Sequence, residues 1–193
     1  MNNTTKGGLL GGGGGAALGA VVGGLIGKGK GAAIGAGIGA AVGAGAGALI
    51  GRKMDKAAEA AKKVEGAQVQ EITDVNGLPA VKVTFDSGIL FGFNSSTLSD
   101  EAKASLANFA EVLKATPDAD VAILGHTDNV GTEKANQSVS EKRAKAVAKH
   151  LEAQGVESKQ IKEVLGMSFN QPVASNDTEE GRAQNRRVEV FMY

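Results

Sequence analysis

The chain has 193 residues, no cysteine, no tryptophan and two histidines, and its 21 basic residues balance 21 acidic ones. Without cysteine it can form no disulfide, no thiol nucleophile and no cysteine-ligated zinc or iron–sulfur site. A neutral chain also lacks the basic surface with which proteins displace counterions from nucleic-acid phosphates. We therefore predict no nucleic-acid partner, no metal site and no cofactor.

Residues 1–51 form a segment rich in glycine and alanine, with 20 of the 29 glycines of the chain. Glycine occupies every fourth position from Gly7 to Gly51, and residues four apart share one face of a helix. A face without side chains lets a second helix approach closely, as small residues do in membrane helix pairs. The basic break KGK at 28–30 separates two uncharged stretches of roughly 20 residues, each long enough to span a bilayer. We predict a glycine zipper, a membrane-associated or self-associating helical hairpin.

The alternative for residues 1–51 is a flexible low-complexity tail, because glycine disfavours a helix in water by about 1 kcal/mol per residue. Residues 52–66 follow, and their alanine, lysine and glutamate content predicts a solvated linker helix that ends at Gly66. Residues 67–193 contain every aromatic residue of the chain and are the predicted globular domain.

Within residues 67–193, strand-like and helix-like patterns alternate. Two β-prone runs flank Asn76-Gly77, a dipeptide typical of hairpin turns, and the apolar run 89–93 either extends the sheet or enters a loop. The later predicted elements are a helix capped by Ser99 and ended at 116–117, a buried strand 121–124, a helix 136–154, a strand 161–165, a loop 168–181 and a final strand 187–193. The order β-α-β-α-β-β predicts an α+β fold with helices packed on a mixed sheet.

One arginine on the second helix is unusual. The apolar stripe of this helix consists of Val139, Val147 and Leu151, and Arg143 lies in the middle of it. Because an unpaired charge facing a core is costly, Arg143 either pairs within the protein or holds an anionic ligand. Asp128 follows the buried strand closely, near the strand end where open α/β sheets bind ligands. These residues alone leave a structural salt bridge and a binding pair both open.

Three motifs resemble the signature of OmpA-like peptidoglycan-binding domains. The central motif is TDNVG at 127–131 followed by NQSVSEKRAKAV at 136–147. Upstream, ILFGFNS at 89–95 resembles the first loop of the family, and downstream GRAQNRRVE at 181–189 resembles its closing motif. The resemblance covers about residues 67–193, and a glycine zipper before such a domain is similar to outer-membrane lipoproteins of this family.

The resemblance implies a non-catalytic module that binds the peptide stem of peptidoglycan without a covalent bond. Its ligand would be meso-diaminopimelate, whose zwitterionic end carries an ammonium and a carboxylate. Asp128 would bind the ammonium, and Arg143 would bind the carboxylate through parallel hydrogen bonds. The residues implied to line or support this pocket are Thr127, Asn136, Val139 and Arg187. Gly92 and Asn94 stand where many family members carry aspartate, which weakens the case for a contact from the first loop.

The same resemblance implies a place at the periplasmic face of the outer membrane of a Gram-negative bacterium, where the chain would tether that membrane to the wall. The glycine zipper would hold the membrane side and could also form a homo-oligomer. A secretory signal peptide is not recognisable before the glycine-rich run, so we expect a mature or truncated chain. A lipidated cysteine just before residue 1 would fit this expectation.

Two other functions compete with wall binding. His126, Asp128 and Ser140 invite a hydrolase interpretation, but the sequence lacks the GxSxG nucleophile elbow, and we predict that the chain is not an enzyme. The second alternative is a membrane scaffold or pore-like assembly built by the glycine zipper, with the C-terminal domain as its anchor.

Overall fold

The computed structural model describes residues 46–73, 79–92 and 95–193. Most of the predicted glycine-zipper hairpin and the predicted turn at Asn76-Gly77 lie outside these residues. Among the helices of the described ranges, none is both long and apolar enough to span a bilayer.

Five strands form one mixed sheet in the order β1-β2-β5-β3-β4. Their bounds are β1 Ala67–Thr73, β2 Pro79–Asp86, β3 Val121–Gly125, β4 Ile161–Gly166 and β5 Arg187–Met192. The central strand β5 runs antiparallel to both β2 and β3, whereas β3 and β4 are parallel. The two runs around Asn76-Gly77 pair as antiparallel β1 and β2, so the predicted strand pairing is confirmed.

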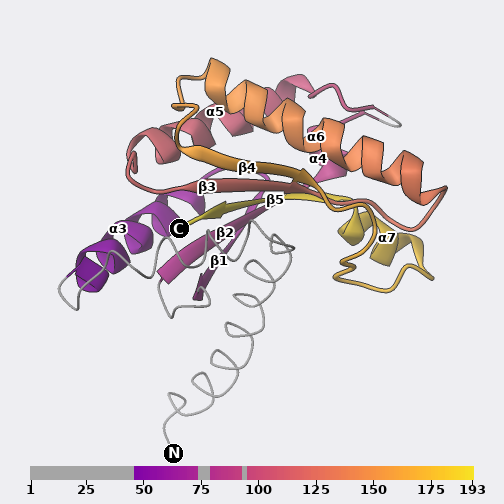
Figure 1. Ribbon diagram of the computed structural model, residues 1–193, viewed down its shortest axis with the longest axis horizontal. Coiled ribbons are helices and arrows are strands. Elements are labelled where there is room, and N and C mark those ends of the chain that lie inside the picture. Colours follow the sequence, from indigo (N-terminus) through magenta and orange to yellow (C-terminus); the bar gives the residue numbers. More distant parts are fainter. Residues whose placement is uncertain (1–45, 74–78, 93–94) are drawn as a thin grey trace, which may run out of the picture.

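The described helices are α3 Ala46–Ala61, α4 Ser87–Leu90, α5 Asp100–Lys114, α6 Glu133–Ala153 and α7 Glu179–Asn185. From β2 onward, the strands and the two long helices follow the predicted β-α-β-α-β-β order. The long helices α5 and α6 lie together over one face of the sheet (Figure 1). The expected α+β fold with helices on a mixed sheet is therefore confirmed.

Two short helices were not predicted. The described part of the run 89–93 contains no strand: α4 ends at Leu90, and the next residue, Phe91, makes only an isolated bridge to Leu98. The loop predicted over 168–181 contains the start of α7, whose first turn is capped by the Thr178 hydroxyl. Both helices are too short to produce a recognisable hydrophobic period, because four and seven residues make two turns at most.

Side-chain caps set where the long helices begin. The Ser99 hydroxyl accepts a hydrogen bond from the N–H of Ala102 at 3.0 Å, as predicted for the start of α5. The second long helix begins three residues before the predicted Asn136, because Thr132 caps it by accepting from the N–H of Ala135 at 3.3 Å. Because α6 begins earlier than predicted, only a short loop connects the end of β3 at Gly125 to the first turn of α6 at Glu133.

Alternation along the strands divides the side chains between two faces of the sheet. On β2, Val81, Val83 and Phe85 are buried on the face that α5 and α6 cover. The Phe85 ring meets that of Phe109 edge to face, with 5.6 Å between the centroids. The residues between them on β2, beginning with Lys82, point to the other face.

Helix α3 differs from the solvated linker helix that the composition of 52–66 indicated. Met54, Ala57, Ala58 and Ala61 are at most 4% exposed and belong to the main core. Their spacing places them on one face of the helix, which packs on β1, β2 and α5. An apolar stripe made mostly of alanine is weak in a hydrophobicity pattern, yet small side chains let the helix pack closely.

Two glycines let α6 lie very close to the ends of β3 and β4. A methyl group on Gly125 would overlap the carbonyl oxygen of Ser140, and one on Gly166 would overlap the backbone of Glu141. Ser140 is fully buried at this contact. Its hydroxyl donates to the Gln137 carbonyl at 3.0 Å and accepts from the N–H of Ser168 at 3.1 Å, which joins helix and sheet.

We expect Gly125→Ala to lower the free energy of unfolding by about 1–3 kcal/mol, because the helix must move away from the strand end to make room. Gly92→Ala is the matched control, since the added carbon would meet only the Ser95 Cβ at an ordinary distance of 3.9 Å. Urea unfolding measures both changes. Equal midpoints for the two variants would contradict the close packing at Gly125.

We expect Ala58→Gln to destabilise the domain by at least about 2 kcal/mol, because it places a larger, polar side chain in a filled apolar site. Lys56→Gln introduces the same side chain at an exposed position of α3 and should change the stability by less than about 0.5 kcal/mol. Thermal unfolding of the two variants tests whether α3 is part of the folded domain. Similar melting temperatures would show that it is not.

Candidate ligand-binding site at the end of β3

Asp128 is held in place by the loop that leaves β3. It is only 8% exposed, and its Oδ1 accepts a hydrogen bond from the N–H of Val130 at 3.0 Å. Val130 in turn accepts from the Asn136 side-chain amide at 3.0 Å, so the first turn of α6 holds the loop. The carboxylate therefore has a fixed position beside the helix.

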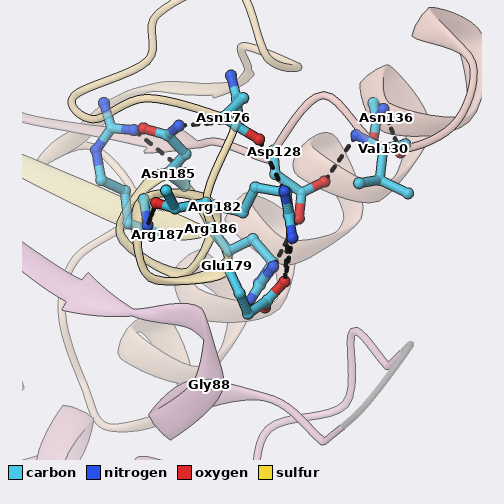
Figure 2. A network of polar contacts seen from close by, with 12 residues as sticks. Gly88, Asp128, Val130, Asn136, Asn176, Glu179, Arg182, Asn185, Arg186 and Arg187 are labelled. Carbon is cyan, nitrogen blue, oxygen red and sulfur yellow. Dashed lines mark hydrogen bonds and ion pairs between the residues drawn. The ribbon is translucent and has the colours of Figure 1, made fainter.

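Arg186 is the ion-pair partner of Asp128. Its Nη1 donates to Oδ2 of Asp128 at 2.7 Å, and its Nη2 donates to Glu179 at 2.7 Å; Figure 2 shows these contacts as dashed lines. Glu179 also accepts two hydrogen bonds from Arg182. The hydrogen bond to Asp128 is the main reason that the pKa of Arg186 lies above its ordinary value, and Glu179 adds to it while burial opposes it. The motif at 181–189 is thus bound, through Arg186, to Asp128 in the loop after β3.

Arg143 lies on the buried side of α6 and is 8% exposed. Its Nε donates to the Ser95 carbonyl at 3.2 Å, and its guanidinium carbon lies 5.2 Å from the centroid of the Phe91 ring. Among the described residues, its two terminal nitrogens have no hydrogen-bond partner. Burial, and then the positive charge of Arg186, lower the pKa of Arg143, while the charge of Asp128 opposes them. The terminal nitrogens can therefore bind an anionic group.

Asp128 and Arg143 do not form an ion pair with each other within the described part of the chain. Asp128 pairs with Arg186 instead, and Arg143 makes its contacts with Ser95 and Phe91. The charges of Asp128 and Arg186 nevertheless act on Arg143, so the three groups share one neighbourhood. The structural salt bridge that the sequence left open is thus formed by a different arginine.

The predicted lining residues lie around these charges. Thr127 is 5% exposed, and its hydroxyl has no partner among the described residues, whereas its N–H donates to the Ser168 carbonyl at 2.9 Å. Asn136 holds the loop, as described above. Val139 precedes Arg143 by one helical turn and is 37% exposed, so it offers apolar surface beside the arginine.

Arg187 is not brought together with Asp128 or Arg143. It begins β5 and points to the face opposite the helices, where its Nε donates to Glu189 at 2.8 Å. Its other nitrogens donate to the carbonyls of Asn185 and Gln171. The closing motif favoured Arg187 over the adjacent Arg186, whereas the ion pair with Asp128 is made by Arg186. The signal that could have separated them is strand alternation, because Val188 faces the helical core and Arg187 must then face away from it.

The residues of the hydrolase interpretation also lie apart. His126 is 1% exposed and faces Glu189, with 3.6 Å between Nε2 and Oε2, on the side of the sheet away from the helices. The Ser140 hydroxyl is bound to Gln137 and Ser168 between α6 and the sheet. The described contacts thus give His126 and Ser140 separate partners.

Comparisons with known proteins agree with this architecture. Family models described as OmpA family and Glycine zipper match residues 90–186 and 7–58. Outer membrane porin F of Pseudomonas aeruginosa is 42% identical over 120 residues, which cover 61% of this chain and 34% of the porin. Peptidoglycan-binding protein ArfA of Mycobacterium tuberculosis is 44% identical over 113 residues, which cover 58% of this chain and 34% of ArfA.

Among solved structures, the cell wall anchor of the T6SS from Pseudomonas aeruginosa has a TM-score of 0.59 and 28% identity, and the match covers 72% of this chain and 96% of that one. The chain spans only 34% of the length of porin F and of ArfA. The predicted N-terminal glycine zipper is confirmed by its family model. The OmpA family model spans half of the chain and includes Asp128, Arg143 and Arg186. The chain therefore belongs to the OmpA family.

Proposed function

We propose that the domain binds the peptide stem of peptidoglycan non-covalently and tethers the outer membrane to the cell wall. The observation that carries this proposal is Arg143, which is buried yet keeps two terminal nitrogens without a partner among the described residues. A buried guanidinium of this kind is costly in the absence of an anion. The similarity to ArfA, whose name states that it binds peptidoglycan, and to a cell wall anchor supports the choice of polymer.

The ligand group that fits the charges is the zwitterionic end of meso-diaminopimelate. Its carboxylate would bind the terminal nitrogens of Arg143, which match the two oxygens of a carboxylate. Arg186 would stabilise the same carboxylate at longer range, since its charge already acts on Arg143. The positive charges of Arg143 and Arg186 would thus both attract the ligand carboxylate.

The ligand ammonium would bind Asp128 without displacing Arg186. An ionised carboxylate has about four acceptor positions, and Asp128 uses one for Val130 and one for Arg186. Thr127 and Asn136 would line this side of the pocket, and Val139 would contact the apolar part of the stem. The proposal assigns binding to these residues and no catalytic step.

The zipper and the domain together suggest how the chain would act in the cell envelope. Relatives such as porin F are named as outer membrane proteins, which supports a place at the periplasmic face of the outer membrane of a Gram-negative bacterium. The glycine zipper would associate with the membrane, and it could also bring several copies of the chain together into a homo-oligomer. A scaffold or pore built by the zipper is compatible with wall binding by the domain.

We expect Arg143→Ala to abolish co-sedimentation of the chain with purified cell-wall sacculi, because the carboxylate loses its only directed partner. The control is Lys142→Ala, which removes an adjacent exposed charge and should sediment like the unmodified chain. Circular dichroism and urea unfolding follow the fold in parallel. If Arg143→Ala sediments normally, or if it loses binding only because it unfolds, the proposed role of Arg143 is wrong.

We expect stem peptides with diaminopimelate to bind at least about tenfold more tightly than matched peptides with lysine. Lysine keeps the ammonium and lacks the side-chain carboxylate, so Arg143 would stay buried without its partner, at a cost of about 1–3 kcal/mol or more. Calorimetric titration of both peptides measures the ratio. Equal affinities would exclude the two-charge recognition, although they would leave wall binding itself intact.

A further inference from the structure

The face of the sheet opposite α5 and α6 carries a second group of buried charges. Lys82 on β2 and Arg187 and Glu189 on β5 are each at most 7% exposed. Arg187 donates to Glu189 at 2.8 Å, and the Lys82 ammonium lies 3.7 Å from the same carboxylate oxygen. Two buried cations thus share one buried carboxylate.

The two cations differ in how their donors are used. Arg187 directs its nitrogens to Glu189 and to the carbonyls of Asn185 and Gln171. The Lys82 ammonium, with three donors, has no hydrogen bond to any described residue and only the longer contact with Glu189. Lys82 is therefore the buried cation with unused hydrogen-bonding capacity.

The neighbouring histidine cannot offset the two cations, because an imidazole is either neutral or positively charged. His126 faces Glu189 from β3, and burial together with the charges of Arg187 and Lys82 lowers its pKa, so that it is neutral at pH 7. Burial alone would raise the pKa of Glu189, but the facing His126 and the charges of Arg187 and Lys82 lower it to about 2. Glu189 is therefore ionised; it contacts both cations, while the second carboxylate of this face, that of Asp86, makes no ion pair with Lys82 among the described residues.

A cleft of about 440 Å³ opens beside Lys82. Its volume lies in the range of about 300–1,000 Å³ that small-ligand pockets have. Its wall is mixed: Val173 and the hydrocarbon parts of the side chains are apolar, and amides and a hydroxyl come from Gln68, Gln70, Gln184 and Thr84. Asp86 also lines it, with one carboxylate oxygen bound to the N–H of Gly88. Side-chain amides can pair with both the N–H and the C=O of a peptide bond.

We propose that this cleft is a second binding site, which takes a short peptide segment ending in a free carboxylate. Lys82 binds the terminal carboxylate, and the glutamine amides and Asp86 pair with the adjacent peptide groups. The site lies on the face of the sheet opposite α6 and Arg143, because Lys82 and Glu189 alternate along β2 and β5 with valines that belong to the core under the helices. It is independent of the proposed contact with diaminopimelate.

The test is an NMR titration of the ¹⁵N-labelled full chain with N-acetyl-alanyl-alanine and, in parallel, with its C-terminal amide. We expect the carboxylate form to shift the amide signals of Thr84 and Gln70, and the amide form to bind at least tenfold more weakly. Lys82→Met, which keeps the length of the side chain and removes its charge, should lose at least tenfold in affinity for the carboxylate form.

Arg143→Ala is the control that separates the two sites, because the shifts at Thr84 should persist in it. Equal binding of the two probes, unchanged binding by Lys82→Met, or shifts confined to the neighbourhood of Asp128 and Arg143 would each overturn the second site. If Lys82 serves only as a structural partner of Glu189, Lys82→Met will lower the unfolding midpoint and the unmodified chain will show no shifts at Thr84.

Discussion

The close contact between α6 and the ends of β3 and β4 is the constraint on which the site depends. Gly125 and Gly166 provide no side chain at this contact, and the buried Ser140 bonds the helix to the backbone after β4. Arg143 follows Ser140 by less than one helical turn, and Asp128 follows Gly125 by three residues. The packing of helix on sheet therefore fixes the separation of the two charges, which a ligand with two charges requires.

The second feature of the site is that its buried arginine, Arg143, has no carboxylate partner among the described residues. Asp128 already has a cationic partner in Arg186, so Arg143 is left with a carbonyl, an aromatic ring and no carboxylate within the described contacts. A structural role alone would favour a direct pair, since an uncompensated buried charge destabilises the fold. The arrangement is expected when a ligand completes the ion pairing, and binding then recovers the free energy that burial costs.

Much of the fold follows from local patterns in the sequence. The β-prone runs around Asn76-Gly77, the Ser99 cap and the apolar run 121–124 predicted strands and a helix that the structure contains. The role of α3 was hidden because its buried face consists mainly of alanine, whose hydrophobicity is modest although its packing is close. Helix α7 was hidden because seven residues do not establish a period.

The sequence predicted some residues of the site better than others. Arg143 was conspicuous, because a charge interrupting an apolar stripe is visible in the sequence, and the motif around Asp128 placed it after a buried strand. The pairing of Asp128 with Arg186 was not predictable, because it joins residues 58 positions apart that only the tertiary fold brings together. The choice between Arg186 and Arg187 required the register of β5, which the sequence suggested only through the alternation of its valines.

The most direct measurement is a structure of the chain bound to a stem peptide that contains meso-diaminopimelate. The account predicts that the side-chain carboxylate of the ligand lies within hydrogen-bond distance of the terminal nitrogens of Arg143. It also predicts the ligand ammonium on Asp128, with the contact between Asp128 and Arg186 retained. A peptide bound elsewhere on the domain, with the terminal nitrogens of Arg143 still without a partner, would contradict it.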